Sequence, residues 1–187
     1  MKHIKIPYKF GKFCYQISRF TGELLQYDSL LETPSLPKKI SDALIVCNNP
    51  YLIRTDICES EFSNPSLLTI KKINKMHDWF LFMGNQKFYI SLLYSRIKKP
   101  LFENTFHAFT AIRNHVPLQV ENKNKLCLQR SLLALKTSKS FKESGVLFIG
   151  ASLPTGNMHA WIIESNSNPD LQDREWIMYK PLLAFYF

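Results

Sequence analysis

The sequence lacks a long apolar run, and none approaches the roughly 18 consecutive apolar residues of a membrane-spanning helix. Glycine and cysteine are scarce, with six and four among 187 residues. The cysteines, at positions 14, 47, 58 and 127, do not follow the spacing of metal ligands. A secretory signal is also missing, because no apolar segment follows the charged first residues. We therefore expect a cytosolic protein with no membrane span, no disulfide framework and no bound metal.

The chain has fewer acidic than basic residues, 15 Asp and Glu against 24 Lys and Arg, which leaves a net charge of +9. Most of the excess lies in residues 71–126, which hold ten basic and three acidic residues. Such a segment is either a solvated face or a patch for an acidic partner. The chain has no zinc-finger, RNA-recognition or helix-turn-helix signature, so we expect no nucleic-acid partner. It also has no Gly-x-x-x-x-Gly-Lys loop that would bind a nucleotide phosphate.

Apolar residues make up 45% of the chain, and its length suits one domain or one domain with a small module. Hydrophobic periodicity and turn residues predict a mixture of helices and strands, hence an α+β fold. The predicted elements are a hairpin over 13–28, helices over 66–75, 102–113 and 127–141, and strands over 145–150, 158–164 and 175–179. Residues 41–46, 79–83 and 88–94 fit either a helix or a strand.

Cys127 follows a polar break at 122–125 and begins an apolar stripe of helical spacing. The spacing therefore predicts a thiol at the start of a helix. The helix dipole and the unpaired N–H groups there favour the thiolate, which is the nucleophilic form. The same N–H groups can hold the oxyanion that forms when a carbonyl is attacked. Cys14, Cys47 and Cys58 have no comparable setting, and we interpret them as structural.

His159 lies on the second of the predicted C-terminal strands, which would pack against the helix of Cys127. An imidazole there can act as base toward the thiol and then as acid toward a leaving amine. A third group has to hold its tautomer, and both Asp170 and Asp173 follow the strand. A lone cysteine on a helix or a lone histidine on a strand is usually structural. The order of Cys, His and Asp on a helix–strand frame is what makes catalysis a serious hypothesis.

Three short strings carry a resemblance to a known family. They are Cys127-Leu-Gln-Arg-Ser, the glycine-bounded strand at 145–150, and His159-Ala-Trp followed by an aspartate. Over residues 126–175 the chain resembles the lasso-peptide biosynthesis B proteins of microcin-type maturation. These are transglutaminase-like cysteine proteases that remove the leader from a precursor peptide. The resemblance implies Cys127 as nucleophile, His159 as base and Asp173 as the orienting acid, with Asp170 as the alternative.

The resemblance also implies a division of the chain. Residues 1–80 would form a winged-helix-like module that recognises the leader peptide. Separately, the predicted hairpin motivates the hypothesis that the leader adds to its edge as a further strand. Residues 81–187 would form a connector and a papain/transglutaminase-like core, a helix packed on a small antiparallel sheet. The implied partners are the precursor peptide and an asparagine-synthetase-like lasso cyclase. No cofactor motif is recognisable, although the family resemblance allows a dependence on ATP.

Two other functions stay open from the sequence. The same triad would serve a transglutaminase-like acyltransferase or an amidase, because these enzymes differ from a peptidase only in what accepts the acyl group. A non-catalytic scaffold that binds the precursor would instead depend on the hairpin and the basic segment.

Overall fold

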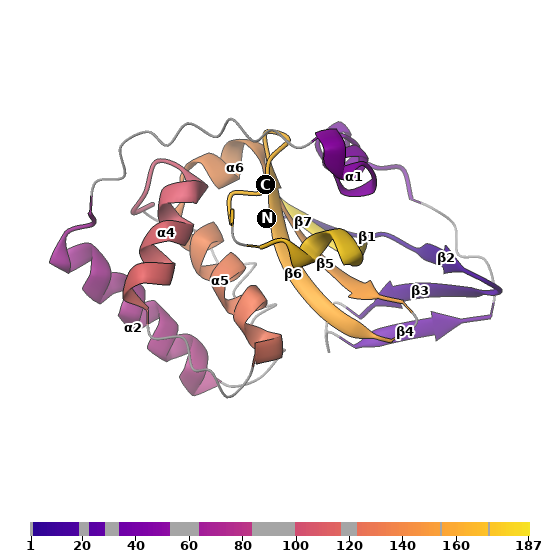
Figure 1. Ribbon diagram of the computed structural model, residues 1–187, viewed down its shortest axis with the longest axis horizontal. Helices are drawn as coiled ribbons and strands as arrows, with labels where there is room; N and C mark the ends of the chain where they lie inside the picture. The colour runs from indigo at the N-terminus through magenta and orange to yellow at the C-terminus, as the bar shows by residue number, and fades with distance from the viewer. Residues whose placement is uncertain are drawn as a thin grey trace.

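The computed structural model describes residues 2–18, 23–28, 34–52, 64–83, 100–116, 123–153, 155–171 and 173–187 (Figure 1). For 79–83 and 123–126 it describes the backbone alone.

The described residues form helices and antiparallel strands, which confirms the predicted α+β class. The helices are α1 (Lys38–Asn48), α2 (Leu67–Met83), α4 (Thr105–His115), α5 (Lys123–Thr137) and α6 (Ser140–Ser144), with 3-10 turns η1 (Pro50–Leu52) and η3 (Glu175–Met178). The strands are β1 (Lys2–Lys5), β2 (Tyr8–Phe10), β3 (Phe13–Ile17), β4 (Leu24–Tyr27), β5 (Gly145–Ser152), β6 (Asn157–Glu164) and β7 (Lys180–Tyr186).

The larger sheet joins the two ends of the chain. Its strand order is β1-β7-β5-β6, and all its neighbours are antiparallel. β1 pairs with β7 in a register that places Lys2 opposite Tyr186. The second sheet has the order β2-β3-β4 and contains the predicted hairpin, which is confirmed as the β3–β4 pair. Strand pairing therefore crosses the boundary predicted near residue 80, because residues 2–5 belong to the sheet of the predicted protease core.

Both faces of the larger sheet are covered. Along β5, Val146 and Phe148 face a cluster with α1, whereas Leu147 and Ala151 face a larger cluster with α4 and α5. Figure 1 shows α1 on one side of the sheet and α4 and α5 on the other. Strands buried on both faces need apolar residues at every position instead of at alternate ones. The two-sided cover explains the continuous apolar runs of β5 and β7.

Helix α5 lies in the centre of the larger cluster. Four consecutive residues, Leu132 to Leu135, have no exposed surface, so the helix is buried all round at this point. One side contacts β6, and the other sides contact α2 and α4. The sequence predicted a single apolar stripe on this helix. The buried surface is wider than that stripe, because α2 and α4 cover the faces of α5 that do not contact β6. This burial fixes the axis of α5 relative to β6.

Gly150 lies at a close approach of neighbouring backbone in the larger sheet. It lies opposite His159 on β6, and a Cβ atom built on it would stand 2.2 Å from the Lys180 carbonyl oxygen and 2.7 Å from the Trp161 ring. No side chain fits there without moving β7. The register between β5 and β7 shifts at the same place, between Ile149 and Gly150. The absence of a side chain at Gly150 therefore allows the backbone of β7 and the ring of Trp161 to pack close to the position opposite His159.

Several element boundaries differ from the prediction. The predicted strand over 175–179 is wrong: Trp176 is buried as the anchor of η3, and the third strand begins at Lys180. Residues 79–83, for which the sequence allowed either a helix or a strand, form the last part of helix α2. The segment 88–94 and Cys58 lie outside the described residues. In the described part of the chain, no helix combines the length and apolar character needed to cross a bilayer.

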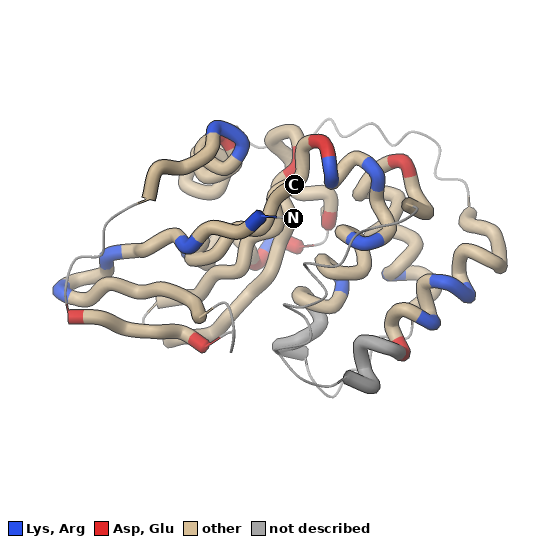
Figure 2. The backbone as a smooth tube through the Cα atoms, turned by 180° about the vertical axis from the view of Figure 1, so that it is seen from behind, with Lys and Arg blue, Asp and Glu red and all other residues tan. Residues whose placement is uncertain are grey.

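Basic residues lie at both ends of the molecule. Figure 2 shows them on the N-terminal strands at one end and along α2 at the other. The described side chains of the basic segment include the exposed Lys71, Lys72 and Lys75 of α2, but its members within 84–99 lie outside the described residues. Arg113, in the same segment, pairs with an aspartate near the candidate site.

Candidate active site

The three residues expected to carry catalysis come together at the edge of the larger sheet. Cys127 lies on α5, His159 on the edge strand β6, and Asp173 on the segment between β6 and η3. His159 is 8% exposed and Cys127 is partly buried against the larger cluster. Because α5 contacts β6 along this edge, the imidazole can be reached from the helix and from the following segment.

His159 is held between the other two groups. Its Nε2 lies 2.9 Å from Oδ1 and 3.0 Å from Oδ2 of Asp173. The Cys127 side chain interacts with the same imidazole and contributes to the raised pKa of His159. The carboxylate occupies Nε2, which leaves Nδ1 as the nitrogen that can exchange a proton with the thiol. This is the arrangement that a cysteine nucleophile requires: a base beside it, and an acid that orients the base.

The surroundings of His159 favour its charged form. Burial by itself would lower the pKa of the imidazole, but the hydrogen bonds and charges of Asp173 and Cys127 outweigh it and raise the pKa of His159 to about 10. An imidazolium held next to a thiol at neutral pH stabilises the thiolate. It is also already protonated for transfer to a leaving amine.

Aromatic rings cover the imidazole. Tyr179 stacks on His159 with ring centroids 4.9 Å apart and an angle of 25° between the planes. Trp161 is roughly parallel to the imidazole at 6.1 Å and contacts Phe148 and Trp176. The face of a tyrosine ring attracts a cation, so Tyr179 supports the imidazolium as well as its orientation. The sequence contained no signal for Tyr179, because it falls where a strand was predicted.

The residues of the Cys-Leu-x-Arg-Ser string have separate contacts. Ser131, four residues after Cys127, donates a hydrogen bond of 3.3 Å to the carbonyl oxygen of Ala160. Ala160 follows His159, so this bond ties the helix to the strand one residue from the imidazole. Arg130, three residues after Cys127, pairs with Asp170. Residues three and four positions apart lie on the same face of a helix. The spacing of Arg130 and Ser131 from Cys127 could therefore have predicted that both make contacts close to the thiol.

The two candidate aspartates have different partners. Asp173 contacts His159, whereas Asp170 pairs with Arg113 at 2.5 Å and with Arg130 at 3.6 Å. The geometry therefore places Asp173, the preferred candidate, at the imidazole, and gives Asp170 to the two arginines. Among the described residues, no group of three or more His, Cys, Asp or Glu is placed to hold a metal ion.

The position of Cys127 in its helix differs from the prediction. Helix α5 begins at Lys123, so the polar run expected as a break forms its first turn and Cys127 is its fifth residue. The first four N–H groups of a helix lack partners within it, and that of the fifth residue can pair with a carbonyl one turn earlier. The expectation that the Cys127 N–H is free to hold an oxyanion is therefore wrong for this geometry.

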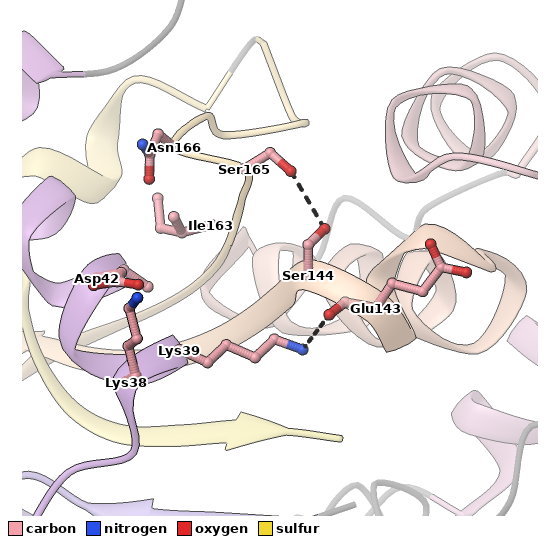
Figure 3. A pocket seen from close by; sticks show the side chains of 9 residues that line it. Lys38, Lys39, Asp42, Glu143, Ser144, Ile163, Ser165 and Asn166 are labelled. Carbon is pink, nitrogen blue, oxygen red and sulfur yellow. Dashed lines mark hydrogen bonds between the residues drawn. The ribbon is translucent and has the colours of Figure 1, made fainter.

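A cavity of about 400 Å³ lies elsewhere, between α1, α6 and the far end of β6 (Figure 3). None of the three candidate catalytic residues lines it. Lys39 crosses it to donate a 3.0 Å hydrogen bond to the Glu143 carbonyl at the end of α6, and Ser165 bonds Ser144. These contacts join α1, α6 and β6, so we interpret the cavity as a seam between elements.

Comparison with known proteins found no match. No protein-family model, no curated protein and no solved structure matches the chain. The resemblance to the B proteins therefore rests on the local sequence strings alone.

The reactivity of Cys127 beside His159 can be tested without a substrate. We expect iodoacetamide at about pH 6, where an ordinary thiol reacts slowly, to label Cys127 well before Cys47. Cys47 is the internal control, because burial raises the pKa of its thiol to about 12. Peptide mass spectrometry would follow each cysteine of the native protein. His159→Ala should slow the labelling of Cys127 without changing that of Cys47, and equal labelling of Cys127 and Cys47 in the unchanged protein would contradict an activated thiol at Cys127.

Proposed function

We propose that the protein is a cysteine peptidase that cleaves a peptide bond with Cys127 as nucleophile, His159 as acid and base, and Asp173 as orienting acid. The observation that carries the proposal is that one imidazole is bound to Asp173 through Nε2 and also interacts with Cys127. The raised pKa of His159 supports it, because a cysteine peptidase works from the thiolate and the imidazolium.

The reaction has two stages. The Cys127 thiolate attacks the carbonyl carbon, and the C–N bond breaks as His159 gives its proton to the departing amine. His159, now neutral, takes a proton from water, and the hydroxide released attacks the thioester. The C–S bond breaks, the acid product leaves, and the proton on His159 restores the starting pair. Asp173 keeps the Nε2 side of the ring in place through both stages.

We propose further that the substrate is the precursor of a lasso peptide and that the bond cleaved joins leader and core. This step rests on the resemblance of the Cys127 and His159 strings to the B proteins. It brings with it a transglutaminase-like core, a winged-helix-like N-terminal module and an asparagine-synthetase-like cyclase as partner. The leader would add to the β3–β4 hairpin as a further strand. Any dependence on ATP would also follow from this family assignment.

Product masses test the proposal. The full-length protein would be incubated with a precursor peptide, with and without the cyclase and ATP, and the products weighed intact. Without the cyclase we expect two fragments whose masses sum to that of the precursor plus one water. With the cyclase and ATP, closure of the lactam ring removes one water again, so the two masses should sum to that of the precursor. A product joined to an added amine would favour the acyltransferase. An intact precursor under all conditions, in a preparation whose Cys127 labels rapidly, would count against a leader peptidase.

A further inference from the structure

Asp170 lies in a buried ionic cluster next to the candidate active site. Its side chain is nine-tenths buried, and its two oxygens pair with Arg113 of α4 and Arg130 of α5. The Nε atoms of both arginines are buried without a hydrogen-bond partner among the described residues. The Asp170 carboxylate is thus the charged group that both guanidinium groups share.

The same aspartate begins the turn that ends at Asp173. The Asp173 N–H donates a 2.9 Å hydrogen bond to the Asp170 carbonyl oxygen. The buried Asn168 joins both residues: its Oδ1 accepts from the Asp170 N–H at 2.9 Å, and its Nδ2 lies 3.4 Å from Asp173 Oδ2. Any displacement of Asp170 is therefore passed to the carboxylate that touches His159.

We propose that Asp170 is a positioning residue, which uses its pairs with Arg113 and Arg130 to hold the Asp173 carboxylate against His159 and in register with the helix of Cys127. Arg130 lies three residues from Cys127 on the same helix, so the cluster links the nucleophile's helix to the orienting acid. Any contribution of this link to catalysis rests on the proposed function. The positioning itself is a property of the folded protein.

A buried ion pair can also be purely structural, and two variants separate the cases. Asp170→Asn breaks both pairs, whereas Arg113→Gln leaves Arg130 with Asp170 and preserves more of the fold. The interactions that raise the pKa of His159 come from Asp173 and Cys127. Arg113 is positively charged and repels a proton on His159. Loss of that charge would relieve the repulsion, and this effect alone would raise the pKa of His159 further. Loss of positioning would lower it, so Arg113→Gln distinguishes the two effects by sign.

The experiment is an NMR titration of the histidines in the full-length protein, with His159→Ala to assign the signal. We expect the pKa of His159 to fall from about 10 toward its ordinary 6.5 in Asp170→Asn and part of the way in Arg113→Gln. Glu103→Gln breaks an exposed pair with Lys139 at the start of α4 and is the matched control. It should leave the titration unchanged. Thermal unfolding would show that each variant is folded.

Unchanged titration in a folded Arg113→Gln variant, or a pKa that rises, would overturn the positioning role. If Asp170→Asn does not fold, Arg113→Gln alone decides. With a cleaved substrate in hand, kcat of Asp170→Asn should fall about 100-fold with little change in KM. If no substrate is cleaved but the titration shifts as expected, the positioning role stands and the proposed function fails.

Discussion

Cys127→Ala should abolish cleavage of the precursor peptide while the protein stays folded. Loss of the nucleophile from a comparable catalytic triad lowers kcat by about 10⁶-fold, because no other group can form the covalent intermediate. The side chain is only partly buried at the edge of the larger cluster, so removal of the sulfur leaves little unfilled volume. Intact-mass analysis of the peptide over time would measure the loss, and thermal unfolding would check the fold.

Cys47→Ala is the matched control for that substitution. Cys47 is another half-buried thiol, on α1 against the opposite face of the sheet, and it packs with the smaller cluster. Its removal should leave cleavage at the rate of the unchanged protein. Cleavage that survives in Cys127→Ala would contradict the peptidase. It would favour the scaffold, in which a bound precursor is processed by another protein.

Much of the site could be predicted, because its residues are close in sequence or stand in local patterns. Cys127 and His159 lie 32 residues apart on a helix and a strand that are joined by the short helix α6 and one further strand, so few packings are possible. The choice between Asp170 and Asp173 was harder. Both lie in one turn, and what separates them is a guanidinium group from α4, 57 residues away from Asp170. A contact between residues so far apart in the chain produces no local sequence pattern from which it could be predicted.

The errors in the fold have the same origin. β1 is a strand because β7 pairs with it, and its Lys-His-Ile-Lys sequence has little strand preference of its own. The apolar residues of η3 suggested a strand, but they serve to bury Trp176. The polar residues at 123–125 suggested a break, yet they form the first turn of α5. In each case a tertiary contact or a helix terminus overrode the local preference.

The described structure places the candidate site where three separately anchored parts meet. Helix α5 is fixed by the complete burial of residues 132–135 and by the Ser131 bond to β6. The strand of His159 is fixed by its pairing with β5, where Gly150 admits the close approach of β7. The segment of Asp173 is fixed by the arginine pairs of Asp170. A triad needs such independent support, because an error of about 1 Å in one member can cost 100-fold in rate.

Asp173→Asn should lower kcat by roughly 100- to 10,000-fold. The amide keeps the shape of the carboxylate, but it removes the charge that stabilises the imidazolium. The pKa of His159, raised to about 10 in the unchanged protein, should therefore fall. Activity needs a protonated imidazole for the leaving amine, so the alkaline limb of the pH–activity profile should move to lower pH. Asp170→Asn is the comparison: loss of activity in that variant alone would show that the acid is assigned to the wrong residue.

The same substitution should change how stability depends on pH. A histidine whose pKa is higher in the folded than in the unfolded protein stabilises the fold fully below its unfolded value, here 6.5. That contribution is lost as the pH rises through the folded value, about 10. The free energy of unfolding of the unchanged protein should therefore decline between these pH values, and that of Asp173→Asn should decline less. Urea unfolding at a series of pH values would measure both curves. Parallel curves would mean that the Asp173 carboxylate does not hold the charge on His159, and the catalytic assignment would lose its electrostatic basis.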